Sequence, residues 1–165
     1  MMLHTSIFLL AISSISLGQS SPQRSKAFGG GGGRPFDDGP GIPPNPRVAS
    51  VTLRGANRLD AITFSLAGRQ PFTHGGSGGS PKTLNLGQGE YVTALKVCRD
   101  YRSEWEANRV YYARVATSNG RTIEVGTPST SCTTHSAPNG MAIVGAHGRS
   151  GGEVDGLGAI YGPRR

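Results

Sequence analysis

Glycine-rich loops that separate short apolar segments most restrict how this chain can fold. Of its 165 residues, 26 are glycine and 11 are proline, and only 16% are charged. Glycine loses much backbone entropy on ordering, and proline lacks the amide hydrogen that a helix interior needs. The composition therefore argues against a helical bundle and favours short strands joined by turns. A chain of this length can bury a core as one domain without help from a metal.

Alternating apolar residues mark the expected strands. The strongest pair, 110–117 and 122–125, is joined by Ser118-Asn119-Gly120, and Asn-Gly is a strong hairpin signal. The other expected strands are 48–53, 59–66, 83–86, 91–98, 141–144 and 154–161. A faint repeat relates Leu59-Asp60 to Val154-Asp155, each an Asp that enters a strand behind a glycine-containing turn. The pattern predicts a pseudo-symmetric all-β fold.

The N-terminus is typical of a secretory leader. Residues 1–18 contain no Lys, Arg, Asp or Glu, and their apolar run is too short to cross a bilayer as a helix. Small residues allow cleavage after Gly18 or Ser20, although a buried N-terminal strand is the alternative. We expect a signal peptide over 1–18, a flexible arm over 19–26, a folded domain over 27–165, and a secreted mature chain without a membrane span.

Cys98 and Cys132 are the only two cysteines. In an oxidising compartment such a pair most simply forms one disulfide, and the alternative is two reduced, buried thiols. A zinc site is not expected, because His135 is the only histidine close in sequence to either cysteine. The sequence predicts no metal and no cofactor.

The chain is basic, with 17 Lys and Arg against 10 Asp and Glu, a formal charge of +7 and a pI near 10.0. This charge suits an acidic polysaccharide, such as a sulfated or uronic-acid glycan. A nucleic-acid role would use the same charge but conflicts with secretion. The cations that would contribute are Arg24, Lys26, Arg99, Arg102, Arg109 and Arg149.

The segment 148–161 joins a glycine-rich turn to a carboxylate at the start of a strand. Gly151 and Gly152 can bring backbone N–H groups close to a ligand, and Asp155 can accept hydrogen bonds from hydroxyls. Donors beside a carboxylate suit a neutral polyol. An ordinary hairpin turn with a solvated Asp is the alternative.

Two further stretches contain side chains that could contact a ligand. In the segment 99–109, Tyr101 and Trp105 could stack on a sugar face or cover the edge of the core, and both interpretations stay open. His74 lies in a glycine loop without a nucleophile nearby, which favours a loop-anchoring role over a catalytic one. With no paired carboxylates in a motif, no Gly-x-Ser-x-Gly and no metal signature, we expect no enzyme activity.

Three segments, in order, resemble the jacalin-related lectins. They are 33–39, the loop 74–79 followed by 89–91, and 147–151 with the Gly-x-x-x-Asp of 151–155. The resemblance extends from about Ala27 to Tyr161. It implies a β-prism I fold, in which three four-stranded antiparallel sheets with pseudo-threefold symmetry bind carbohydrate at one end.

The resemblance also implies a set of sugar-binding residues. Backbone N–H groups of Gly152 and Glu153 would donate, both carboxylate oxygens of Asp155 would accept, and Gly33, with Gly32 beside it, would add a donor. Relatives whose chain continues uncut before this glycine tend to favour mannose or glucose over galactose, as expected here.

The chain departs from its relatives in three respects. The spacing from Gly55 to Asp60 is one residue longer than Gly-x-x-x-Asp, which predicts one sugar site rather than two. Gly152 and Glu153 lack the aromatic residue of many relatives, which predicts weak binding unless Tyr101 or Trp105 compensates. The cysteine pair is not general in the family. The exact glycan and any homo-oligomerisation stay open at this stage.

Overall fold

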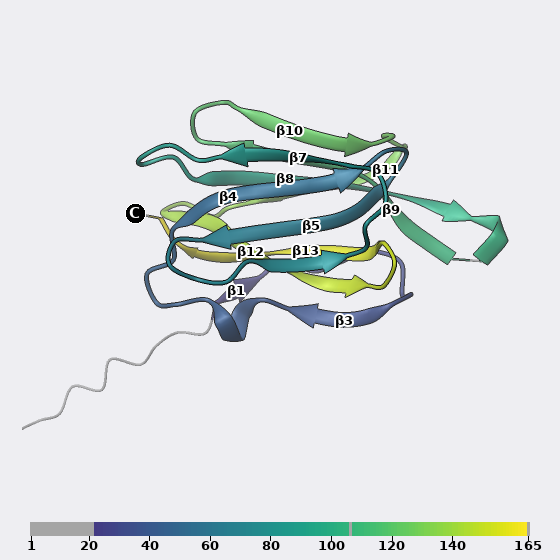
Figure 1. Ribbon diagram of the computed structural model, residues 1–165, viewed down its shortest axis with the longest axis horizontal. Coiled ribbons are helices and arrows are strands. Elements are labelled where there is room, and N and C mark those ends of the chain that lie inside the picture. Colours follow the sequence, from purple (N-terminus) through teal and green to yellow (C-terminus); the bar gives the residue numbers. More distant parts are fainter. Residues whose placement is uncertain (1–21, 106, 165) are drawn as a thin grey trace, which may run out of the picture.

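The computed structural model describes residues 22–105 and 107–164, so the expected signal peptide and the start of the arm lie outside the described residues. The described part contains 13 strands and two short 3-10 turns (Figure 1). The strands are β1 (Gln23–Arg24), β2 (Phe28–Gly29), β3 (Arg34–Asp37), β4 (Val48–Gly55), β5 (Leu59–Leu66), β6 (Phe72–Gly75), β7 (Ser80–Asn85), β8 (Val92–Arg102), β9 (Ala107–Thr117), β10 (Thr122–Gly126), β11 (Ser131–Ser136), β12 (Met141–Ser150) and β13 (Val154–Pro163). The turns are η1 (Gly39–Gly41) and η2 (Ser103–Trp105).

The strands form a four-stranded and a nine-stranded antiparallel sheet, and the nine-stranded one divides at a single bridging pair, so that three sheets can be distinguished. The first has the order β6-β5-β4-β7, and the second has the order β10-β9-β8-β11. In the third, β12 and β13 lie at the centre, β3 pairs with β12, and β1 and β2 pair with β13. A single pair, Ile143 opposite Val92, joins the second sheet to the third. The expectation of three four-stranded sheets is confirmed, with β1 and β2 together serving as one edge strand.

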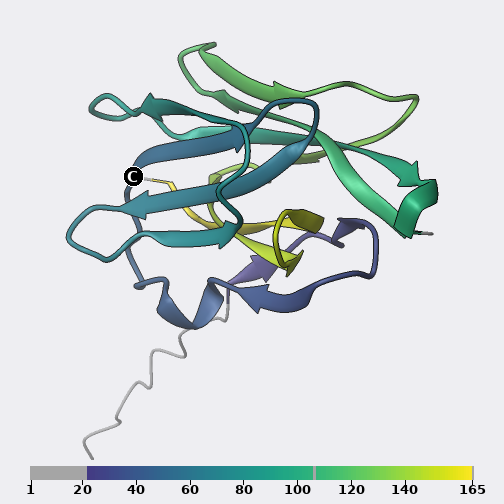
Figure 2. The same ribbon diagram turned by 45° about the vertical axis from the view of Figure 1, so that its right-hand side comes forward.

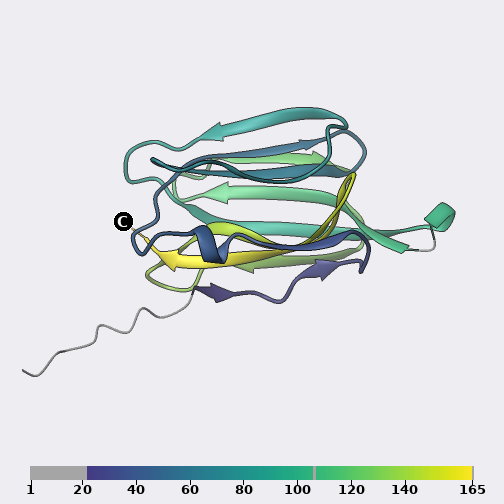
Figure 3. The same cartoon turned by 60° about the horizontal axis from the view of Figure 1, so that its bottom comes forward.

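All three sheets share one connectivity. A central hairpin is followed by a strand beside its second member and then by a strand beside its first. In the third sheet the hairpin is β12–β13, and the strands that complete it come from the N-terminus. Figures 2 and 3 show these early strands, in purple and blue, beside the yellow C-terminal ones. The two ends of the domain therefore meet in one sheet.

The N-terminal arm is shorter than expected. Gln23 and Arg24 pair with Tyr161 and Ile160 of β13, and the backbone N–H of Ser25 donates to the carbonyl of Ala159 over 3.0 Å. The prediction of a flexible arm is wrong for residues 22–26. The segment looks disordered by composition because an edge strand on the surface carries polar side chains.

Apolar residues from all three sheets fill the interior of the prism. The largest fully buried side chains are Phe64, Leu53, Leu59, Ile62, Leu95, Ile143, Leu157, Ile160, Val51, Val92, Val97 and Val110. Most of the expected strands supply members of this core, as their alternating pattern requires. No helix in the described part of the chain is long and apolar enough to cross a membrane.

A disulfide joins Cys98 to Cys132, which lie directly opposite each other on β8 and β11. It confirms the expected pairing and ties the edge strand of the second sheet to its neighbour. Closing a loop of this length stabilises the fold by about 3–4 kcal/mol in the chain-entropy model.

The segment 99–109, expected as a loop, is the end of the β8–β9 hairpin. Arg99 to Arg102 pair with Val110 to Ala107, and η2 closes the turn. Figure 1 shows this hairpin projecting beyond the other strands on the right. Charged and aromatic residues are tolerated there because the projecting strands have no core to face.

A buried carboxylate, that of Glu90, anchors the opposite margin of the second sheet. It accepts hydrogen bonds from Arg121 Nε (2.9 Å), Thr117 Oγ1 (2.5 Å) and the backbone N–H of Gly87 (2.8 Å). The Arg121 hydrogen bond, followed by those from Thr117 and Gly87, lowers the pKa of Glu90 from 4.5 to about 2. Ionised Glu90 therefore stabilises the folded state.

Glu90→Gln should lower the free energy of unfolding by about 1–3 kcal/mol at neutral pH, because the charged hydrogen bonds are lost. The folded-state pKa lies below the unfolded one, so this contribution is complete above pH 4.5 and disappears as the pH falls towards about 2. Denaturant titrations of both proteins across that range should converge at acid pH. A constant difference at all pH values would contradict the assignment.

Candidate functional site

A hollow of about 320 Å³ lies at the end of the prism where the β12–β13 turn meets the early glycine loop. Four of the predicted sugar-binding residues line it, namely Gly33, Gly152, Glu153 and Asp155. The fifth, Gly32, lies beside them, since a Cβ placed on it would be 2.6 Å from Asp155 Oδ1. The fold thus brings together segments that are about 120 residues apart in the chain.

The approach of the early loop to Asp155 requires glycine at position 33. Gly33 has a φ of +65°, and a Cβ there would lie 2.6 Å from the carbonyl oxygen of Ser150 and collide with Asp155 Oδ2. Gly31 differs, because a Cβ there would meet nothing within 4 Å. Within the glycine run, the site therefore requires glycine at position 33 but not at position 31.

Arg149 fixes the early loop against the third sheet. Its Nε donates to the carbonyl of Gly32 over 2.9 Å, and its Nη2 donates to the carbonyl of Gly33 over 2.8 Å. Behind them, the backbone N–H of Gly30 donates to the carbonyl of Asp155 over 2.7 Å. From the sequence, Arg149 is expected only as a surface cation, whereas in the structure it positions the loop.

The carboxylate of Asp155 is almost fully buried, at 4% side-chain exposure, and it is ion-paired. Its Oδ1 lies 2.6 Å from Nη1 of Arg109. Burial raises the pKa of Asp155, and the positive charges of Arg109 and Arg149 oppose that rise. The expected acceptor is therefore present, but one of its oxygens already has a partner.

Glu153 holds two arginines of the same hollow. Its Oε1 accepts from Arg109 Nε over 3.0 Å, and its Oε2 accepts from Arg58 Nε. From the sequence, only the backbone of Glu153 is expected to take part, and Arg58 is not expected in the site. With the side chain of Glu153 only 8% exposed, the three residues form a compact ion triad on the inner wall.

The internal repeat explains why these three residues meet. In each sheet, one carbonyl of the second hairpin strand accepts from a neighbouring loop: Asp60 accepts from Gly76 (2.9 Å), Tyr111 from Thr127 (2.9 Å) and Asp155 from Gly30 (2.7 Å). Asp60, Tyr111 and Asp155 are therefore equivalent positions. Two residues before them stand Arg58, Arg109 and Glu153. Arg58, Arg109 and Glu153 therefore occupy the same position of the repeat, and each sheet contributes one of them.

The pairing register also shows how the two Asp-containing loops, around Asp60 and Asp155, correspond to each other. The β4–β5 and β12–β13 hairpins each contain an irregularity at the same place, and Gly55 pairs with Leu59 as Ser150 pairs with Val154. Gly55 thus corresponds to Ser150 rather than to Gly151, and the loops are equal in length. The prediction of a single site from a longer second spacing is wrong in its premise, because the sequences were aligned one residue out of register.

Tyr101, one of the two aromatic residues expected to compensate, does not line this hollow. Tyr101 is 54% exposed on the projecting β8–β9 hairpin. The side chain of Trp105 lies outside the described residues. Compensation for the missing aromatic at positions 152 and 153 therefore has no support from Tyr101.

His74 has the anchoring role expected for it. Its Nε2 lies 2.6 Å from Asp38 Oδ1, and its ring stacks on Phe36 with centroids 3.8 Å apart. Asp38 Oδ2 also accepts the backbone N–H of Ala146 over 2.8 Å. These contacts join β6 to the third sheet and leave the ring without a nucleophile among its described contacts.

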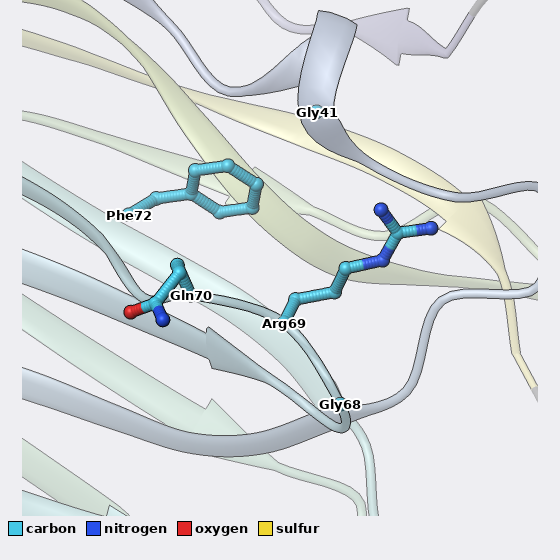
Figure 4. A pocket seen from close by; sticks show the side chains of 5 residues that line it. All are labelled: Gly41, Gly68, Arg69, Gln70 and Phe72. Atoms are coloured by element: carbon cyan, nitrogen blue, oxygen red, sulfur yellow. The ribbon is translucent and has the colours of Figure 1, made fainter.

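A wider hollow, of about 600 Å³, lies at the β5–β6 turn, at the other end of β5 from the Asp60 loop. Figure 4 shows Arg69, Gln70 and Phe72 around it, with Gly41 and Gly68 at its margin. No predicted sugar-binding residue lines it, and it lacks a carboxylate to accept from hydroxyls. Size alone does not make it a sugar site. In the described residues, no group of three or more His, Cys, Asp and Glu side chains could hold a metal ion.

Comparisons with known proteins identify the family of the chain. Residues 25–160 match the model of the jacalin-like lectin domain. Horcolin of Hordeum vulgare is 28% identical over 152 residues, covering 87% of this chain and 99% of that protein. Secreted RxLR effector protein 19 of Plasmopara viticola is 27% identical over 160 residues, covering 90% and 85%.

The fold has solved counterparts as well. The structure of a mannose-binding jacalin-related lectin from Ananas comosus superposes with a TM-score of 0.73 at 25% identity, covering 87% of this chain and 99% of that one. Banana lectin superposes with the same TM-score at 24% identity. The family model covers most of the chain, and the early glycine loop lies beside Asp155. The chain therefore belongs to the jacalin-like lectin domain family, whose members bind carbohydrate and are not enzymes.

Proposed function

We propose that this protein is a secreted lectin that binds mannose- or glucose-type glycans in the hollow formed by the early glycine loop and the β12–β13 turn. The observation that carries the proposal is the meeting of Gly33 with Asp155, because it puts a backbone donor beside a carboxylate acceptor. Hydrogen bonds from hydroxyls to an ionised carboxylate are roughly twice as strong as neutral ones. The mannose-binding relative from Ananas comosus supports the choice of sugar.

The chemistry of each group determines which hydrogen bond it would make to the sugar. Asp155 accepts from two neighbouring hydroxyls, while the backbone N–H groups of Gly33, Gly152 and Glu153 donate to sugar oxygens and fix the orientation of the ring. The uncut chain before Gly33 is consistent with mannose or glucose rather than galactose.

Secretion is part of the same proposal. It is supported by the charge-free apolar segment over 1–18 and by the disulfide, since disulfides persist in oxidising compartments. The relative from Plasmopara viticola is itself named a secreted protein. Peptide sequencing of the protein recovered from a eukaryotic culture medium should find a mature N-terminus after Gly18 or Ser20.

Asp155→Asn should weaken binding of methyl α-mannoside by about 1.5–3 kcal/mol, more than tenfold, because the charged acceptor is lost while the shape of the side chain is kept. Isothermal titration calorimetry measures the affinity, and circular dichroism checks the fold. Asp60→Asn is the matched variant at the equivalent position of the first sheet. No loss of affinity in a folded Asp155→Asn variant, or a larger loss in Asp60→Asn, would overturn the assignment to Asp155.

Gly33→Ala should abolish most mannose binding, because its Cβ would push the early loop away from Asp155 and Ser150. Gly31→Ala lies in the same loop, where the added methyl meets nothing within 4 Å, and should bind as the wild type does. Glycan-array signals for the two variants, at matched concentrations of folded protein, make the comparison. Similar signals would separate the glycine loop from the sugar site.

A second candidate function, binding of acidic polysaccharide, is favoured by a hollow of about 430 Å³ near β2 and β11. Lys26, Arg99 and His135 line it, and the guanidinium of Arg99 lies 4.9 Å above the centre of the Phe28 ring. In residues 22–105 and 107–164, neither Lys26 nor Arg99 pairs with a carboxylate. Two such cations beside each other suit a sulfate or carboxylate group of a glycan.

The double variant Lys26→Gln/Arg99→Gln should bind dextran sulfate several-fold more weakly than the wild type. Arg69→Gln/Lys82→Gln removes the same charge from the first sheet and its β5–β6 turn, and should have a smaller effect. Binding should also fall steeply with added salt, since screening acts over about 8 Å at physiological ionic strength. If both double variants lose equally, general surface charge rather than this hollow accounts for the binding.

A further inference from the structure

Arg109 occupies the acceptor that the proposed sugar site depends on. Its Nη1 lies 2.6 Å from Asp155 Oδ1, and its Nε donates to Glu153 Oε1 over 3.0 Å. The side chain is only 13% exposed, so water competes little for these contacts. One oxygen of the carboxylate is thus engaged by a cation before any sugar arrives.

We infer that Arg109 is a specificity-determining residue, which lowers the affinity of the site for neutral sugars by competing with their hydroxyls for Asp155. The inference rests on the proposed function. A guanidinium–carboxylate hydrogen bond carries two opposite charges, whereas a sugar hydroxyl is a neutral donor. A neutral sugar must therefore share Oδ1 with Arg109 or displace it, and either route costs part of the binding energy.

The ion triad allows Arg109 to be replaced without leaving Glu153 unpaired. Glu153 is held by both Arg58 and Arg109, so Arg58 still pairs with Glu153 when Arg109 is removed. The removal therefore does not leave Glu153 as an unpaired buried charge, which would be strongly destabilising. Asp155 likewise keeps the positive charge of Arg149 nearby.

The charged groups around Asp155 also make the pH dependence of sugar binding a second readout, which a purely structural role of Arg109 would not change. Arg109 faces it from β9 and Arg149 from β12, while Glu153 of its own turn and Arg58 of the β4–β5 turn line the same hollow. The glycine loop 29–33 brings no titratable side chain. The charge of Arg109 lowers the pKa of Asp155 against the effect of burial. Without Arg109 that pKa rises, so sugar binding should be lost at a higher pH on acidification.

The test compares Arg109→Met with Arg109→Lys. Arg109→Met should bind methyl α-mannoside roughly threefold to tenfold more tightly at neutral pH, since a competing charged donor has been removed. Its binding should also disappear at a higher pH than that of the wild type. Arg109→Lys keeps the charge and should stay close to the wild type in both respects. Unchanged or weaker binding by a folded Arg109→Met variant would overturn the inference.

A measurement on the wild type covers the case in which Arg109→Met does not fold. The ¹⁵N resonances of the Arg109 side chain should shift when mannose is added, because the ligand shares or takes the Asp155 oxygen. Resonances that stay in place at saturating mannose would refute the competition. If the wild type binds no mannose and Asp155→Asn changes nothing, the proposed function has failed instead, which separates the two outcomes.

Discussion

Backbone pairing between the two ends of the chain is the interaction on which the rest of the structure depends. β1 and β2 pair with β13, and β3 pairs with β12, so the third sheet is completed only when the N-terminal segment docks. The same docking brings the glycine loop between β2 and β3 against the β12–β13 turn. Sheet closure and site formation are therefore one event, and a chain that could not close its third sheet would have no Gly33 beside Asp155.

Pseudo-threefold repetition gives the site its charges as well as its shape. Equivalent positions of the three hairpins point to the same end of the prism, where Arg58, Arg109 and Glu153 meet. Two cations share one carboxylate there, and Arg109 reaches on to Asp155. The repeat thus connects an ion triad to the carboxylate of Asp155 through Arg109.

Some basic residues of the chain form ion pairs or hold loops, and others line a separate hollow. Arg24, Arg109 and Arg121 pair with carboxylates, and Arg149 holds the carbonyls of the glycine loop. Lys26 and Arg99 border a separate hollow beside Phe28. The proposed neutral-sugar site lies in the hollow around Asp155, and the cationic hollow lies near β2 and β11, so the two differ in place and in chemistry.

The sequence by itself determined the β-strand content and favoured the disulfide between Cys98 and Cys132, because alternation and redox chemistry are local properties. The expectation that the early glycine loop lies beside Asp155 came from the resemblance to the lectin family. Tertiary structure alone decided the edge-strand role of residues 22–26, the register that equates Gly55 with Ser150, and the capture of Asp155 by Arg109. The physical reason is distance along the chain. The two arginines of the triad reach Glu153 across 44 and 95 residues, and no spacing pattern encodes such contacts until three equivalent hairpins converge.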